Sequence, residues 1–319
     1  MTEINEIAPS SLAHLIGMPG VTAQVEVGIE AAFADNKKFD DALLTGPPGC
    51  GKTQTAKIIA AEMATNFHEV LGQSVESAAD LNALLLTAQD RDVVFVDESH
   101  ELRKEIQTAL YLAIDQRKIC INGGRAGSAI QCIPIANFTL LLATTDEFKL
   151  LQPLRDRMKL TLRFGFYGDD DLATLTRQRS RGLGWVVDDD DVFAEIAKRS
   201  RGTPRLALRL LQASRRVCRA EGETHITREN LERACLLESI DGLGLGVTEQ
   251  QYLAVLTEGA TRLNVVASRL GLPSRTVSQV TEPILIRLGL IDKDDQGRRV
   301  LTRKGWEHLH QQQPGRYES

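Results

Sequence analysis

The stretch Gly46-Pro47-Pro48-Gly49-Cys50-Gly51-Lys52-Thr53 follows an apolar run that ends in Leu43-Leu44 and leads into residues 54–61, which have the composition of a helix. A strand, a glycine-rich turn and a helix start in this order are the setting of a phosphate-binding loop. Glycines let backbone N–H groups close around phosphates, and the helix N-terminus adds partial positive charge. In such a loop Lys52 reaches the β- and γ-phosphates, and the Thr53 hydroxyl binds Mg²⁺. The sequence therefore predicts a nucleotide site here; the alternative is a plain turn between a strand and a helix.

Composition limits the other possibilities. The chain has 319 residues, which suggests two or three domains, and 42% of them are hydrophobic, enough for packed cores. No apolar stretch has the roughly 18 residues that a membrane span needs, and the N-terminus lacks the features of a signal peptide, so we expect a cytoplasmic protein without membrane contact. The net charge of −5 still allows a local basic patch to bind nucleic acid. The cysteines show no C-x-x-C spacing, which indicates reduced thiols; they are Cys50, Cys120, Cys132, Cys218 and Cys235.

A second motif, Asp92-Val93-Val94-Phe95-Val96-Asp97-Glu98, is a run of β-branched and aromatic residues that ends in two carboxylates. It predicts a buried parallel strand, which places Asp97 and Glu98 at the carboxyl edge of a sheet, where ligands bind. Asp97 would hold Mg²⁺ through its water shell, and Glu98 would polarise the attacking water. Taken alone, such a pair is often a solvated strand end. After a phosphate-binding loop, it predicts an enzyme that hydrolyses ATP.

Three further groups could complete this site. A buried apolar run ends at Thr145, which could sense the γ-phosphate. In Pro153-Leu154-Arg155-Asp156-Arg157, one arginine could reach the site of a neighbouring subunit in a ring. Such an arginine is typically worth about 10³–10⁵ in rate. The residues alone do not choose between Arg155 and Arg157, and a local salt-bridge cluster is the alternative. Arg205 lies at a helix start that could fold over the nucleotide.

Residues 118–133 place β-forming residues on both sides of a glycine-rich turn at 122–128. This pattern predicts a β-hairpin inserted into the nucleotide-binding domain. An inserted hairpin is usually a contact for a partner or substrate, but a purely structural flap fits the sequence equally well.

The C-terminal part predicts a different domain. Two short helices are separated by residues 271–273, and a hairpin follows them, which is the layout of a winged helix. Its wing carries Lys293 and Arg298, which suit phosphate contacts, although such domains also bind proteins. The glycine-rich residues 242–246 predict a flexible linker. We therefore expect three domains, at residues 1–167, 168–242 and 243–319.

Taken together and in this order, the motifs resemble the RuvB family, the bacterial Holliday junction branch-migration motors of the AAA+ class, over nearly the whole chain. The resemblance implies an α/β fold with an AAA+ P-loop ATPase core and a parallel sheet, a small α-helical lid and a C-terminal winged helix. It implies that Asp97 and Glu98 form the Walker B pair, that Thr145 is sensor 1 and that Arg205 is sensor 2. Arg155 or Arg157 would be the arginine finger. The implied nucleotide-binding residues are Leu15, Ile16, Pro48, Gly49, Gly51, Lys52, Thr53, Gln54, Tyr167, Arg157 and Arg205.

The resemblance also implies partners. It implies ATP and Mg²⁺ as cofactors, a homohexameric ring around duplex DNA, and DNA contacts through Lys293 and Arg298. The hairpin at residues 118–133 would dock on a RuvA-type junction-binding protein. The chain departs from the family pattern near the N-terminus, where Ile7-Ala8-Pro9 stands for Leu-Arg-Pro, and at Gln54 and Ser99.

Two functional hypotheses follow. The first is an ATP-driven motor that moves four-way DNA junctions. The second is an AAA+ switch of the clamp-loader or regulator type, which uses ATP to assemble a partner without moving along DNA. Junction-stimulated ATP hydrolysis and ATP-dependent branch migration would distinguish them.

Overall fold

The structure is a computed structural model that describes residues 4, 7–121 and 131–312. The chain divides into two compact units, Met1–Arg228 and Glu229–Ser319. Among the described helices, none combines the length and the apolar composition that a membrane crossing requires.

The first unit contains a five-stranded parallel sheet with the strand order β2-β3-β6-β1-β7. Its strands are β1 (Ala42–Thr45), β2 (Phe67–Leu71), β3 (Val93–Asp97), β6 (Thr139–Thr144) and β7 (Leu160–Arg163). Strand β6 lies between β1 and β3. The phosphate-binding loop, the end of β6 and the two carboxylates therefore meet at the carboxyl edge of the sheet, as the sequence predicts.

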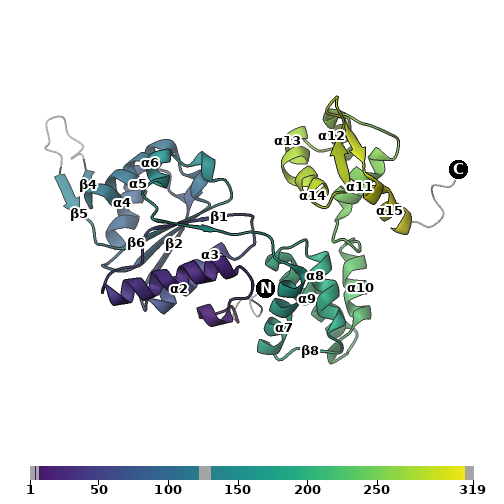
Figure 1. The fold of residues 1–319 in the computed structure, drawn as a ribbon, viewed down its shortest axis with the longest axis horizontal. Coiled ribbons are helices and arrows are strands. Elements are labelled where there is room, and N and C mark those ends of the chain that lie inside the picture. Colours follow the sequence, from purple (N-terminus) through teal and green to yellow (C-terminus); the bar gives the residue numbers. More distant parts are fainter. Residues whose placement is uncertain (1–3, 5–6, 122–130, 313–319) are drawn as a thin grey trace. The chain divides into compact units, whose positions relative to one another are not determined.

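Alternate residues of the strands pack on opposite faces of the sheet. Helices cover both faces (Figure 1). One face is covered by α2 (Pro19–Ala34) and α3 (Lys52–Glu62), whose buried side chains contact Leu44, Phe95 and Leu141. The other face is covered by α4 (Ala78–Thr87) and α5 (Lys104–Gln116), which pack on Leu43, Val94 and Leu142. Because both faces are buried, the inner strands β1, β3 and β6 read as nearly continuous apolar runs rather than as alternating ones.

The predicted hairpin is present as β4 (Lys118–Ile121) and β5 (Gln131–Pro134), and its tip at 122–130 lies outside the described residues. The register pairs Cys120 with Cys132, and the two form a disulfide. The prediction that all cysteines are reduced thiols is therefore wrong for this pair. The two residues are 12 positions apart, and only the antiparallel register brings them face to face.

Helices α7 (Asp169–Gly182), α8 (Asp191–Arg199) and α9 (Pro204–Ala220) pack on one another after the sheet. Two short parallel strands, β8 (Val186–Val187) and β9 (His225–Ile226), close this helical part. The helix α10 (Arg228–Leu237) spans the division between the two units.

The second unit has the predicted winged-helix layout. Its helices are α11 (Val247–Leu256), α12 (Leu263–Leu270), α13 (Ser274–Thr276), α14 (Glu282–Arg287) and α15 (Arg303–Gln312), and its wing is the antiparallel pair β10 (Ile291–Lys293) and β11 (Arg299–Leu301). A π-helical segment, η5 (Val277–Thr281), joins α13 to α14. Pro283 follows it and has no N–H to donate to the preceding turn, which is a physical reason for the widened helix.

The glycine-rich residues 242–246 are ordered, which corrects the expected flexible linker. Asp241 Oδ1 accepts the N–H groups of Leu243 and Leu245, each at 2.9 Å. Leu245 is fully buried in the core of the second unit. His308 Nε2 lies 2.9 Å from Asp241 Oδ2, so the last helix also fixes this turn.

A buried ion pair joins the wing to the helices of the second unit. Glu282 is 2% exposed and accepts hydrogen bonds from Arg299 Nε at 2.5 Å and from the Tyr252 hydroxyl at 2.7 Å. Burial raises the pKa of Glu282, but these hydrogen bonds outweigh it and hold the pKa below its usual value.

We expect the substitution Glu282→Gln to destabilise the second unit by about 3–5 kcal/mol, because it leaves the Arg299 charge buried and uncompensated. Hydrogen exchange of the full chain, read at residues of α14 and β11, measures this loss. Glu258→Gln is the matched control, because Glu258 is exposed and pairs with Arg269 at the surface. Equal protection of Glu282→Gln and the native chain would contradict the structural role of the pair.

Candidate functional site

The loop at 46–53 has the backbone that only glycine adopts without strain. The φ angles are 148° at Gly46, 76° at Gly49 and 97° at Gly51. A Cβ at Gly46 would lie 2.3 Å from the carbonyl oxygen of Phe164. The loop therefore needs its glycines both for its turns and for its close approach to the chain that follows β7.

Lys52 begins α3 and is 6% exposed. Its Nζ donates hydrogen bonds to the carbonyl oxygens of Gly46 at 2.8 Å and of Pro47 at 2.9 Å. Burial lowers its pKa, and the nearby carboxylates of Glu98 and Asp97 oppose this shift. The ammonium is thus already oriented inside the loop, which fits a phosphate as its ligand.

The residues also fit Mg²⁺. The Thr53 hydroxyl donates to Asp97 Oδ2 at 3.0 Å, so one hydroxyl and one carboxylate lie together beside the loop. No group of three or more His, Cys, Asp or Glu side chains gathers into a metal cage within the described part of the chain. Mg²⁺ bound with a nucleotide needs no such cage, because it takes few carboxylates and keeps waters and phosphate oxygens.

Glu98 follows β3 in the left-handed region, with φ at 47°, which is strained for a residue with a side chain. The turn is fixed by its neighbours: the Ser99 hydroxyl is buried and donates to the carbonyl oxygen of Ala143 at 2.9 Å. Gly72, in the short helix η2 (Gly72–Ser74), packs against the Glu98 backbone, and a Cβ there would lie 2.5 Å from the Glu98 carbonyl oxygen.

We therefore expect Gly72→Ala to lower the rate of ATP hydrolysis, by up to about 10²-fold, because its Cβ would displace the Glu98 turn. Nucleotide affinity should change little, since Lys52 and Thr53 are not displaced. Steady-state hydrolysis and nucleotide titration measure the two effects. Gly20→Ala is the control, because nothing lies within 4 Å of a Cβ at Gly20. A native rate in Gly72→Ala would contradict the role of this contact.

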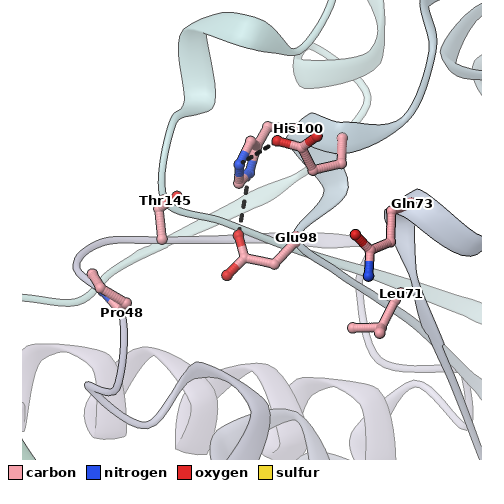
Figure 2. A pocket seen from close by; sticks show the side chains of 7 residues that line it. Pro48, Leu71, Gln73, Glu98, His100 and Thr145 are labelled. Carbon is pink, nitrogen blue, oxygen red and sulfur yellow. Dashed lines mark ion pairs between the residues drawn. The ribbon is translucent and has the colours of Figure 1, made fainter. Parts of the chain in front are cut away.

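Sequence reasoning missed His100, which lies at the centre of the site. Its Nδ1 is 3.3 Å from Glu98 Oε2 and 3.1 Å from the Thr144 hydroxyl, and its Nε2 is 3.2 Å from Glu101 Oε1. Figure 2 shows the ion pair between the His100 imidazole and the Glu98 carboxylate. The only signal in the sequence was its place two residues after Glu98.

Thr145, the residue predicted to sense the γ-phosphate, is exposed and follows the buried Thr144. It lines a cavity of about 480 Å³ with Pro48 and Glu98, and Figure 2 shows Pro48 and Thr145 on one side with Glu98 across from them. The rest of the lining is Leu71, Gln73, His100 and Glu101. Pro48 of the phosphate-binding loop, Glu98 after β3 and Thr145 after β6 therefore open onto one space.

Of the residues expected at the base of the nucleotide, Tyr167 contacts the same loop. Tyr167 packs against Gly17, and its hydroxyl donates to the Cys50 carbonyl oxygen at 3.4 Å. Burial raises the pKa of Tyr167 to about 12, so its phenol stays protonated at neutral pH. Leu15 and Ile16 are half-buried in the adjoining segment. Gln54 instead donates to the Pro9 carbonyl oxygen at 2.8 Å, which ties the N-terminal segment to α3.

The helical part also reaches the loop. Arg205 lies in the first turn of α9, and its N–H donates to the Gly49 carbonyl oxygen at 3.4 Å. A Cβ at Gly49 would lie 3.0 Å from both the Arg205 and the Thr203 side chains. Arg205 is thus beside the phosphate-binding loop.

Arg155 and Arg157 contact other parts of their own chain. Arg157 forms an ion pair with Asp115, donates to the Pro153 carbonyl oxygen at 2.8 Å and lies over the ring of Tyr111. The Arg155 guanidinium lies 5.4 Å from the ring centre of Phe148 and donates to the side chain of Gln152. Among the described hydrogen bonds and ion pairs, neither arginine contacts the phosphate-binding loop of its own chain.

The wing presents fewer available cations than the sequence suggests. Arg299 is held by the buried Glu282, and Arg298 pairs with Asp294 at 2.7 Å. The Lys293 side chain is 48% exposed and lies 3.9 Å from Glu282. Of the two predicted DNA contacts, Lys293 is therefore the less neutralised.

Comparison with known proteins agrees with this geometry. The family model of the Holliday junction DNA helicase RuvB P-loop domain matches residues 7–164, that of the RuvB AAA lid domain matches residues 167–241, and that of the RuvB C-terminal winged helix domain matches residues 242–310.

Individual relatives extend the match over nearly the whole chain. The Holliday junction branch migration complex subunit RuvB of Kosmotoga olearia is 37% identical over 95% of this chain and 90% of its own. That of Koribacter versatilis is 35% identical over 98% of this chain and 88% of its own. The solved structure of the Thermotoga maritima RuvB Holliday junction branch migration motor has a TM-score of 0.79 and is 33% identical, over 95% of this chain and 97% of its own. The chain is therefore a member of the RuvB family, with its P-loop, lid and winged-helix parts in the same order.

Proposed function

We propose that this chain is the ATP-hydrolysing motor subunit that drives branch migration of Holliday junctions. It would work as a homohexameric ring around duplex DNA, with a RuvA-type partner on the hairpin at 118–133. The domains are an ATPase domain at 1–167, a lid at 168–242 and a winged helix at 243–319. The observation that carries the proposal is the meeting of Pro48 from the phosphate-binding loop, Glu98 and Thr145 around one cavity, in a chain that matches RuvB over nearly its full length.

The residues suggest how the chain binds ATP. The glycine backbone of the loop and Lys52 would hold the β- and γ-phosphates, and the α3 N-terminus adds partial positive charge. Thr53 and Asp97 would hold Mg²⁺, which supplies positive charge against the phosphate oxygens. Tyr167, Leu15 and Ile16 would line the pocket for the base. Arg205 would contact the bound phosphates and so link them to the lid.

Glu98 is the proposed general base. Its carboxylate faces the cavity beside Thr145 and would accept the proton of the attacking water. His100 holds the other side of the carboxylate through its Nδ1 and so limits the orientations that Glu98 can adopt. Thr145 would donate its hydroxyl to the γ-phosphate.

The positive charge that stabilises the transferring phosphoryl group would come from the neighbouring subunit. Arg155 and Arg157 contact groups of their own chain away from the phosphate-binding loop. In a ring, one of them would reach the cavity of the next copy. Hydrolysis would then change the contact between two neighbouring subunits. Because both subunits hold DNA, this change would move the DNA.

The wing is the proposed DNA contact. We expect Lys293→Ala and Arg298→Ala each to weaken duplex binding and to reduce the salt dependence of log K by about one unit of slope, because each removes one phosphate contact. Lys293→Ala should have the larger effect on affinity, since Asp294 already neutralises Arg298. Fluorescence anisotropy across a salt series measures both. Lys37→Ala is the control, because Lys37 lies in the other unit. Unchanged slopes in both wing variants would contradict the contact.

The deciding experiment uses a synthetic four-way junction with labelled arms. The chain should convert it to two duplexes only when ATP, Mg²⁺ and a RuvA-type partner are present, and the junction should stimulate ATP hydrolysis. Partner recruitment that needs ATP but moves no junction would instead favour the AAA+ switch.

A further inference from the structure

The cysteines of the hairpin differ from the other three in their surroundings. Cys120 and Cys132 are both exposed, and they face each other across the ladder. The remaining cysteines, Cys50, Cys218 and Cys235, are each at most 2% exposed. Reagents in solution can therefore reach the hairpin pair while the folded chain shields the others.

The hairpin has one anchored face and one solvent face. Ile119 is 4% exposed and Ile133 is half-buried, and both pack on the core that covers the α5 side of the sheet. The next pair along the ladder, Cys120 and Cys132, points to the opposite side, because side chains alternate along a strand. The disulfide therefore joins the two strands next to the pair that is packed on the core. One further pair of the ladder, Ile121 and Gln131, is described beyond it.

We propose that Cys120 and Cys132 form a reversible thiol–disulfide site whose state sets the order of the hairpin. Its oxidant is a low-molecular-weight disulfide such as oxidised glutathione. One protein thiolate attacks that disulfide and releases one glutathione thiol; the second protein thiolate then attacks the mixed disulfide and releases the other. In total, two protein thiols and one small disulfide become one protein disulfide and two small thiols, and the reverse reaction restores the protein thiols.

The physical consequence is local. A two-stranded ladder alone is marginally stable in water, so the reduced hairpin depends on its few hydrogen bonds beyond the anchored Ile119 pair. The disulfide removes much of the freedom that the outer part of this ladder would otherwise have. Helix α5 begins after the carboxyl end of β3 and leads back toward the amino end of the next strand of the sheet, β6. The hairpin comes between α5 and β6, so the hairpin lies at the edge of the sheet opposite the nucleotide site. ATP turnover should therefore not depend on the redox state.

A second consequence rests on the proposed function. If the hairpin docks on the RuvA-type partner, the oxidised hairpin is already ordered and loses less freedom on binding. We expect the reduced form to bind the partner about two- to tenfold more weakly. The nucleotide site is common to both forms, so their ATP turnover serves as the internal reference.

The site itself is tested with the full chain, equilibrated in buffers of defined reduced and oxidised glutathione ratio. Alkylation of the native protein, followed by mass spectrometry, should show Cys120 and Cys132 losing the label together as the oxidised fraction rises, and regaining it on reduction. The three buried cysteines should be labelled only after denaturation. Absence of the disulfide in fully oxidised glutathione, or a disulfide that excess thiol does not reverse, would overturn the proposal.

The effect on the hairpin is tested by hydrogen exchange at 118–121 and 131–134. Protection should be greater in the oxidised chain, while ATP turnover stays equal in both forms. The double variant Cys120→Ser with Cys132→Ser should show low protection in both buffers. Equal protection of the oxidised and reduced native chain would overturn the claim about order. Equal partner affinity of both forms would overturn the claim about docking, whereas failure of both forms to move a junction with the partner present would count against the proposed function alone.

Discussion

Replacing Glu98 by glutamine will leave ATP binding intact and lower kcat for hydrolysis by about 10²–10⁴-fold. The reason is the position of the carboxylate. Glu98 lines the cavity that it shares with Pro48 and Thr145, whereas Lys52 and Thr53, the proposed phosphate and Mg²⁺ ligands, form their hydrogen bonds with other groups. The amide of glutamine keeps the shape of the side chain but accepts a proton poorly. ATP affinity should therefore stay unchanged while the rate of hydrolysis falls.

This prediction is checked by single-turnover hydrolysis together with nucleotide titration of the same preparation. Glu105→Gln is the matched control, because Glu105 is an exposed carboxylate in the first turn of α5, outside the cavity. Lys52→Ala is the complementary variant and should abolish nucleotide binding. A Glu98→Gln chain that hydrolyses ATP at the native rate would show that another group takes the proton.

Replacing the proposed arginine finger, which is either Arg155 or Arg157, will lower hydrolysis by about 10³–10⁵-fold, again with ATP binding retained. Arg155→Ala and Arg157→Ala should therefore differ sharply, because one removes the finger and the other removes only contacts within its own chain. Those contacts are the ring of Phe148 for Arg155 and the ion pair with Asp115 for Arg157. Both sets lie near the surface, so neither substitution should unfold the chain.

The two variants are compared by steady-state hydrolysis, nucleotide affinity and thermal unfolding. Asp115→Asn separates the roles further, because it breaks the ion pair and leaves Arg157 in place. If Arg157 is the finger, Asp115→Asn should retain far more activity than Arg157→Ala. Native rates in both arginine variants would exclude a finger in this segment.

The sequence predicted the parts of the site that depend on local pattern. The phosphate-binding loop and the ends of β3 and β6 each combine an apolar run with polar residues at its end, so their place at the carboxyl edge follows from the parallel sheet. Strand β7 was not predicted, because a run of four residues with two leucines is too short to indicate a strand. Only its pairing with β1 in the structure identifies it as one.

What the sequence could not predict depends on contacts between distant residues. His100 is recognisable only once Glu98 and Thr144 are placed around it. The Cys120–Cys132 disulfide requires the register of the hairpin. The turn at 242–246 looked flexible because of its glycines, yet Leu245 is fully buried and Asp241 binds the backbone.

The central claim is that each ATP is cleaved at a site built by two copies of the chain. The most direct measurement mixes two inactive variants: Lys52→Ala, which cannot bind nucleotide but keeps its arginines, and the inactive arginine variant, which binds nucleotide but lacks the finger. In a mixed ring, the nucleotide site of the arginine variant meets the arginine of the Lys52→Ala neighbour. Hydrolysis should therefore reappear in the mixture and peak near equal proportions. A mixture as inactive as its two components would contradict the shared site.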